Sequence, residues 1–114
     1  MRVTSALWAS ALVRRYFGVG AVATIARRGA EEAGAIFIIL DRLDGTGDLY
    51  GPAPQSSFEE GRPSDRLFQK VAAGDGLPAI GLRIEREARF DPDLWVVAIE
   101  DREARLFFET VGSD

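Results

Sequence analysis

The chain has 114 residues, of which 46% are hydrophobic, 28% charged and 10% aromatic, as is typical of a soluble globular protein. We expect one domain over residues 1–114, because two domains would each be too small to bury an adequate core. The absence of Cys and His excludes disulfides, thiolate or imidazole metal sites, thiol nucleophiles and Ser-His-Asp catalysis. No cofactor and no bound metal are predicted from this composition.

The net charge of −4 is unevenly distributed along the chain. Residues 1–30 contain five Arg and no acidic residue, whereas residues 31–114 contain 18 acidic residues against nine basic ones. We expect the two parts to pack together and to pair their charges. The alternative is a basic patch on an acidic body, which would bind an anionic partner.

The N-terminal segment has some features of an export signal. Residues 6–13 form an apolar run that contains the small-residue sequence Ala-Ser-Ala. The run is short, however, and it is closed at once by Arg14 and Arg15, so we expect a cytoplasmic protein. No run approaches the roughly 18–20 apolar residues of a membrane-spanning helix, and no membrane contact is predicted.

The first predicted element is a helix that begins at Thr4 or Ser5 and ends at Gly18 or Gly20. Its apolar residues recur with helical spacing and predict one buried face, made of Leu7, Trp8, Ala11, Leu12 and Tyr16.

Three strands are predicted next. Residues 21–28 alternate in polarity as a strand does, and residues 35–40 form a continuous apolar run that is typical of a central strand buried on both faces. Asp-Gly-Thr-Gly at residues 44–47 predicts a hairpin turn, after which residues 48–50 begin the returning strand. Residues 51–63 form the longest predicted loop.

The second half of the chain predicts further strands around one helix. Residues 67–72 favour a strand. Residues 77–90 fit both periodicities, but their charged composition and Pro78 in the first turn favour a helix, which Pro92 ends by Asp91. Residues 94–100 form a second buried strand, and residues 105–109 a final one, with Phe107 and Phe108 on opposite faces.

This order of elements predicts an α+β fold. We expect a mostly antiparallel sheet of about five or six strands, because tight turns join the strands. Two main helices, the N-terminal one and residues 77–90, are expected to pack on this sheet and to cover one of its faces.

Two sequence patterns resemble ligand-binding motifs. Residues 18–23 match G-x-G-x-x-A, with Asp41 at a suitable distance, but a dinucleotide site needs a strand before the glycines and a helix after them, and here the predicted order is reversed. Asp44 to Asp48 places oxygen atoms at alternate positions as a calcium loop does, but it lacks the invariant Gly and the distal Glu of that loop. We interpret it as the hairpin turn.

The pair Asp91 and Asp93, next to Trp95, most resembles a functional site. Two neighbouring carboxylates can share a proton or bind a hard cation. The alternative is structural: Pro92 ends a helix there, and Asp93 bonds to local backbone N–H groups. The same two interpretations apply to Asp41 and Arg42, which end a buried strand.

Four segments of the chain form a recognisable pattern: residues 11–15, 27–36, 50–55 and 89–97. The most specific part is Phe-Asp-Pro-Asp-Leu-Trp at residues 90–95. Together these segments, which extend over nearly the whole chain, resemble the uncharacterised alphaproteobacterial family catalogued as domain of unknown function 1491. The resemblance implies a small bacterial cytoplasmic protein and no particular activity.

We favour a non-catalytic binding or interaction domain, with a homo-oligomer or a protein partner, because the sequence offers no convincing pair of nucleophile and base. The first alternative is a carboxylate- or metal-dependent enzyme that uses Asp91 and Asp93. The second is anion or nucleic-acid binding through Arg14, Arg15, Arg27 and Arg28, which the acidic remainder disfavours. The candidate contacts are Arg14, Arg15, Arg28, Asp41, Tyr50, Arg89, Asp91, Asp93 and Trp95.

Overall fold

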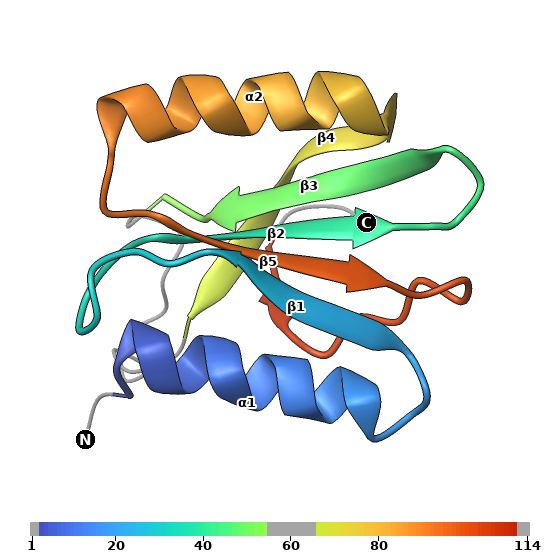
Figure 1. Cartoon of the computed structure of the whole chain (residues 1–114), viewed down its shortest axis with the longest axis horizontal. Coiled ribbons are helices and arrows are strands. Elements are labelled where there is room, and N and C mark those ends of the chain that lie inside the picture. The colour runs from blue at the N-terminus through green and yellow to red at the C-terminus, as the bar shows by residue number, and fades with distance from the viewer. Residues whose placement is uncertain (1–2, 55–65, 112–114) are drawn as a thin grey trace.

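The structure, a computed structural model, describes residues 3–54 and 66–111 (Figure 1). The predicted loop over residues 51–63 therefore lies largely outside the described residues. No helix in the described ranges is long and apolar enough to cross a membrane. In chain order the elements are α1 (Ser5–Phe17), β1 (Val22–Arg27), β2 (Ile36–Asp41), β3 (Thr46–Pro52), β4 (Leu67–Gly76), α2 (Leu77–Phe90), β5 (Trp95–Glu100) and β6 (Glu109–Thr110).

The strands form one six-stranded sheet in the order β1-β5-β2-β3-β4-β6. Three neighbouring pairs are antiparallel, β1 with β5, β2 with β3 and β3 with β4. Two pairs are parallel, β2 with β5 and β4 with β6. The predicted α+β fold with a mostly antiparallel sheet is confirmed, and β2 lies inside the sheet as its apolar run predicts.

Both helices begin and end where the sequence places their caps. The side-chain hydroxyl of Thr4 accepts a hydrogen bond from the Leu7 backbone N–H at the start of α1, and Gly18 follows its last residue. Pro78 occupies the first turn of α2, and Asp91 follows its last turn. The predicted face of α1 is only partly right, because Leu7 is 62% exposed although Leu12 and Tyr16 are buried.

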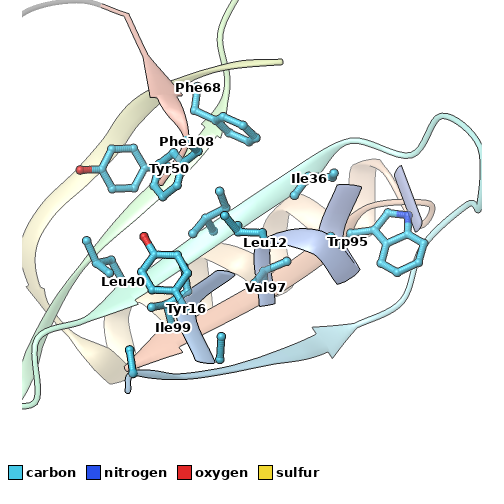
Figure 2. Close-up of a cluster of buried hydrophobic side chains, with 14 residues drawn as sticks. Leu12, Tyr16, Ile36, Leu40, Tyr50, Phe68, Trp95, Val97, Ile99 and Phe108 are labelled. Atoms are coloured by element: carbon cyan, nitrogen blue, oxygen red, sulfur yellow. The ribbon is translucent and has the colours of Figure 1, made fainter. Parts of the chain in front are cut away.

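The two helices lie on opposite faces of the sheet, so the expectation that they cover one face was wrong. Ile36 and Ile38 of β2 pack in a cluster with α1, whereas Phe37, between them, packs with Ile80 of α2. Successive side chains of a strand point to opposite faces, so a strand that is apolar on both faces needs a cover on each. Figure 2 shows the cluster on the α1 side.

The end of the chain departs from the predicted strand over residues 105–109. Strand β6 contains only Glu109 and Thr110, and the residues before it run outside regular structure. The rings of Phe107 and Phe108 were expected on opposite faces, but both pack against the α1-side cluster. Phe108 is edge-on to Tyr50 at 5.0 Å between ring centroids, and Phe107 lies 4.8 Å from the Tyr16 ring. The packing of these two rings therefore holds residues 107 and 108 against the α1 side of the sheet.

Candidate ligand-binding pocket

A cavity of about 570 Å³ opens on the α1 side of the sheet, where β3 and β4 extend beyond α1. The segment after β5, orange-red in Figure 1, turns back toward β4 and forms the opposite wall. The lining therefore combines residues from three separate parts of the chain. These residues are Leu40, Arg42, Asp48, Tyr50, Gln69, Lys70, Ala104, Leu106, Thr110 and Val111.

The hairpin between β2 and β3 places an ion pair at this cavity. The Asp44 carboxylate accepts hydrogen bonds from the backbone N–H and the hydroxyl of Thr46, at 2.9 and 2.7 Å, which closes the turn. The resulting register sets Leu40 opposite Asp48. Arg42 Nη2 then reaches Asp48 Oδ2 at 2.5 Å across the hairpin.

The carboxylate of Asp48 is fully buried and already has its partners. Oδ2 accepts from Arg42, and Oδ1 accepts from the backbone N–H of Gly74 at 2.8 Å. A buried carboxylate needs such partners because water does not solvate it. The hydrogen bond to Asp48 raises the pKa of the Arg42 guanidinium above its ordinary value. Arg42 remains a permanent cation with 39% of its side chain exposed.

Tyr50 and Lys70 form the next part of the lining. They are cross-strand partners on β3 and β4, and Lys70 Nζ lies 5.7 Å from the centroid of the Tyr50 ring. The Tyr50 ring is buried against Phe108, while Figure 2 shows its hydroxyl pointing away from the buried cluster. Lys70 is the only lysine of the chain.

The opposite wall is held by Asp101, which is 3% exposed. Its carboxylate accepts from the backbone N–H groups of Glu103 and Arg105 and from the Arg105 side chain. The guanidinium of Arg105 is the main reason that the pKa of Asp101 lies below its ordinary value. This turn holds Ala104, a lining residue, at φ 53°, a conformation that costs energy for any residue but Gly.

Tyr16 of α1 fixes the residues that follow this turn. Its hydroxyl donates a hydrogen bond to the Arg105 carbonyl oxygen and accepts one from the Phe107 N–H at 3.2 Å. Burial raises the pKa of this hydroxyl, so Tyr16 stays neutral. Residues 105–107 are thus held both to the preceding turn, through Asp101, and to α1, through Tyr16.

The lining divides into a charged part and an apolar part. Arg42 and Lys70 against Asp48 leave a net charge of +1 at the cavity. Leu40, Leu106 and Val111 supply apolar surface beside these charges. Across residues 3–54 and 66–111 no group of three or more acidic side chains could hold a metal ion. The arrangement suits a ligand that carries both charge and hydrocarbon.

Of the candidate contacts proposed from the sequence, Tyr50 lines this cavity, as does Arg42, which the sequence singled out together with Asp41. Asp91, Asp93, Trp95 and Arg28 come together elsewhere, at the end of the sheet where β1 finishes and β5 begins. The Arg28 guanidinium lies 5.7 Å from the Trp95 ring, whose indole N–H donates to the Ala30 carbonyl oxygen at 2.7 Å.

Asp91 and Asp93 both form hydrogen bonds with backbone groups at this end of the sheet. Asp91 Oδ1 accepts a hydrogen bond from the Asp93 N–H at 3.2 Å, and the Asp93 carbonyl oxygen accepts from the Ala30 N–H at 2.9 Å. Arg27 donates to the Pro92 carbonyl oxygen at 2.9 Å. These contacts are structural, but the side chain that accepts a local backbone N–H is that of Asp91, where that of Asp93 was expected.

The remaining candidates are dispersed. Arg14 and Arg15 lie near the end of α1, and Arg15 stacks on Phe107 with 4.4 Å between the guanidinium and the ring centroid. Arg89 is exposed in the last turn of α2. Asp41, at the end of β2, accepts from the Leu43 N–H at 2.8 Å.

The two motif-like patterns have structural explanations. Residues 18–23 follow a helix and lead into β1, which is the reverse of a dinucleotide-binding turn. Asp44 closes the hairpin and Asp48 pairs with Arg42, so the calcium-like spacing belongs to the turn.

Sequence reasoning missed Lys70 and the wall formed by Leu106, Thr110 and Val111. No motif joins these residues, which meet only through the pairing of β3, β4 and β6. One signal in the sequence could have drawn attention to Lys70. It is the single lysine among fourteen basic residues, and an ammonium group is not interchangeable with the guanidinium of the other thirteen.

Comparisons with known proteins identify the family. A family model described as "Protein of unknown function (DUF1491)" matches residues 3–109. One similar protein is from A. tumefaciens, and its solution structure has a TM-score of 0.85. The two sequences are 43% identical, and the match spans 100% of this chain and 98% of the A. tumefaciens chain.

Two solved structures from Caulobacter crescentus extend this likeness. A crystal structure and an NMR structure, each of a DUF1491 family protein, are both 35% identical, cover 98% of this chain and have TM-scores of 0.79. The match spans 100% of the chain in the crystal structure and 99% of the chain in the NMR structure. No curated protein matches the chain. The match over residues 3–109, together with these relatives, shows that the chain belongs to the DUF1491 family of proteins of unknown function.

Proposed function

We propose that this protein is a non-catalytic binding domain whose ligand occupies the cavity between β3, β4 and residues 104–111. The observation that carries the proposal is the cavity itself, whose volume of about 570 Å³ falls in the range of small-molecule sites. Its walls combine apolar side chains with a few charged groups, as ligand pockets do. The left-handed Ala104 turn, fixed by Asp101, forms one of these walls in advance of any ligand.

Binding is favoured over turnover because the buried carboxylate at this cavity is already engaged. Asp48 accepts from Arg42 and from the Gly74 N–H, so accepting a proton would sacrifice a buried ion pair. A general base must instead have a lone pair directed at the substrate.

The experiment is a ligand-observed and ¹H–¹⁵N NMR screen with a library of small polar and apolar fragments. We expect the hits to shift amide signals of residues around Tyr50, Lys70 and Leu106. The variant Leu106→Trp, which places a large ring at the cavity, should abolish these shifts.

A matched control is Leu82→Trp on α2, where the leucine is 64% exposed and far from the lining. It should leave all hits unchanged. A screen without hits at the cavity, or hits that Leu106→Trp leaves intact, overturns the proposal.

We also propose self-association through the edge of the sheet at β1, which is unpaired within the described chain. Phe17, Val19 and Val22 are 57, 40 and 51% exposed where α1 leads into this strand. A second copy would cover this apolar surface. Light scattering over a dilution series should show a dimer that Val22→Lys dissociates, and a monomer at every concentration would refute self-association.

A further inference from the structure

We propose that the ligand of the cavity is a singly charged organic acid, whose carboxylate lies between Arg42 and Lys70 and whose hydrocarbon part lies against Leu106 and Val111. This inference rests on the proposed function and names the ligand class for the same site.

The charge of the lining fits one negative charge. Arg42 and Lys70 contribute two cations, and Asp48 neutralises one of them. A monoanion would therefore complete the neutralisation, whereas a dianion would leave an excess negative charge. The net charge of −4 on the whole chain further disfavours polyanions such as nucleotides with several phosphates.

The donors are present at the charged part of the lining. Arg42 uses Nη2 on Asp48, and its guanidinium has further N–H groups on a partly exposed side chain. Lys70 contacts the face of the Tyr50 ring and pairs with no carboxylate of the described chain, so its ammonium protons are available to an incoming anion. Charge-assisted bonds of this kind are the strong ones in ligand sites.

The apolar wall determines the rest of the ligand. Leu106 is 45% exposed at the cavity, and the partly buried Val111 continues this surface, whereas Leu40 is almost fully buried beneath the lining. Covering Leu106 and Val111 with hydrocarbon removes apolar area from water, which favours binding by about 25 cal/mol per Å². An inorganic anion cannot supply that contribution, whereas an aliphatic or aromatic acid does.

The test uses four probes that share one hydrocarbon chain: hexanoate, hexanol, hexylamine and hexyl phosphate. Because Lys70 is the only lysine, reductive methylation with ¹³C-formaldehyde labels only its Nζ and the α-amino group, and the charge is retained. Titration at neutral pH should shift the Lys70 methyl signal with hexanoate, and hexanoate should bind more tightly than the other three probes.

Two charge variants test how much the positive charge of Lys70 contributes to hexanoate binding. Lys70→Gln, followed by amide shifts, should weaken hexanoate binding by about tenfold and leave hexanol binding unchanged. Arg89→Gln removes an exposed positive charge on α2, outside the lining, and should leave hexanoate binding unchanged. Arg42 is not substituted, because its loss would leave the buried Asp48 carboxylate unpaired.

The outcomes separate this inference from the function on which it rests. Hexanol or hexylamine binding at the cavity as tightly as hexanoate overturns the acid class while binding in the cavity stands. Tighter binding of hexyl phosphate also overturns it, in favour of a dianion. If no probe of this set binds, the acid class is refuted, and the fragment screen decides separately whether the cavity binds anything.

Discussion

The side chains of Asp101 and Arg105 meet through two parallel contacts, Nε to Oδ2 at 3.0 Å and Nη2 to Oδ1 at 3.1 Å. The same carboxylate also accepts from the backbone N–H of Arg105 at 3.1 Å. One buried group therefore sets both the backbone turn and the direction of the side chain that leaves it. Because the next residues form a wall of the cavity, Asp101 links the stability of the fold to the shape of the pocket.

Replacing Asp101 by Ala should lower the free energy of unfolding by about 2–3 kcal/mol, since it leaves two partly buried backbone donors and the Arg105 guanidinium without their acceptor. Chemical denaturation measures this loss. Arg102→Ala, an exposed neighbour in the same turn, is the matched control and should change stability by less than about 0.5 kcal/mol. Equal effects of the two substitutions would show that the carboxylate does not hold the turn.

Stability should fall at acid pH through the same group. The pKa of Asp101 is lowered in the folded state, chiefly by its hydrogen bond to Arg105, so its ionised form stabilises the fold above the unfolded pKa of about 3.9. This contribution is lost as the pH falls through the lower folded-state pKa. Denaturation midpoints measured from neutral pH to below pH 4 should decline less steeply for Asp101→Asn than for the parent chain. Parallel pH profiles would contradict this assignment.

The elements that could be predicted from the sequence are those that local chemistry determines. Pro78 in the first turn and Pro92 beyond the last one delimit α2, and the apolar runs of β2 and β5 each predict a buried strand. The pairing of these two strands could not be predicted, because it joins Ile36 to Trp95 and depends on how the whole sheet assembles.

The candidate site was harder to predict than the fold. Tyr50 was a candidate because it precedes a glycine at the entrance of the long predicted loop, and it lies in the lining of the cavity. Lys70 and Leu106 carry no local signal and acquire a role only when β4 and the C-terminal segment come together. The expected strand over residues 105–109 was wrong at its start for a local reason: the Asp101 carboxylate binds the Arg105 backbone N–H, which is then not available for pairing with a strand.

Two glycines should respond in opposite ways to substitution by alanine. A Cβ on Gly34 would lie 2.3 Å from the Asp93 carbonyl oxygen and 3.0 Å from the Ala30 backbone, neither of which can move aside cheaply. We expect Gly34→Ala to cost about 1–3 kcal/mol, as overpacking does. Gly81→Ala, in α2 with no atom within 4 Å of the added Cβ, should stabilise by about 0.5–1 kcal/mol. Thermal denaturation compares them directly, and a stabilising Gly34→Ala would disprove the close packing against Asp93.

Divalent cations should leave the melting temperature unchanged. Asp91 Oδ1 accepts from the Asp93 N–H, and Asp91 and Asp93 belong to no group of three acidic side chains within the described ranges. A carboxylate pair alone supplies fewer oxygen ligands than Ca²⁺ or Mg²⁺ takes in proteins. Thermal shift with Mg²⁺, Mn²⁺ and Ca²⁺ checks this expectation. Stabilisation that disappears in Asp93→Asn would instead support the metal-dependent enzyme considered from the sequence.

Nucleic acid should not bind to the N-terminal arginines. The Ala21 N–H donates to the Tyr16 carbonyl oxygen at 3.0 Å, so the end of α1 that carries Arg14 and Arg15 lies beside the start of β1. Arg27 and Arg28 lie at the other end of this six-residue strand, about 20 Å away at the usual rise per residue.

Four cations divided in this way do not form one phosphate-binding surface, and Arg27 already donates to the Pro92 carbonyl oxygen. Fluorescence anisotropy with labelled single-stranded RNA and duplex DNA at low salt should show no change on addition of the protein. Binding that weakens steeply with salt and is lost in the Arg14→Gln/Arg15→Gln double variant would reverse this conclusion, because such salt dependence is the signature of phosphate contacts.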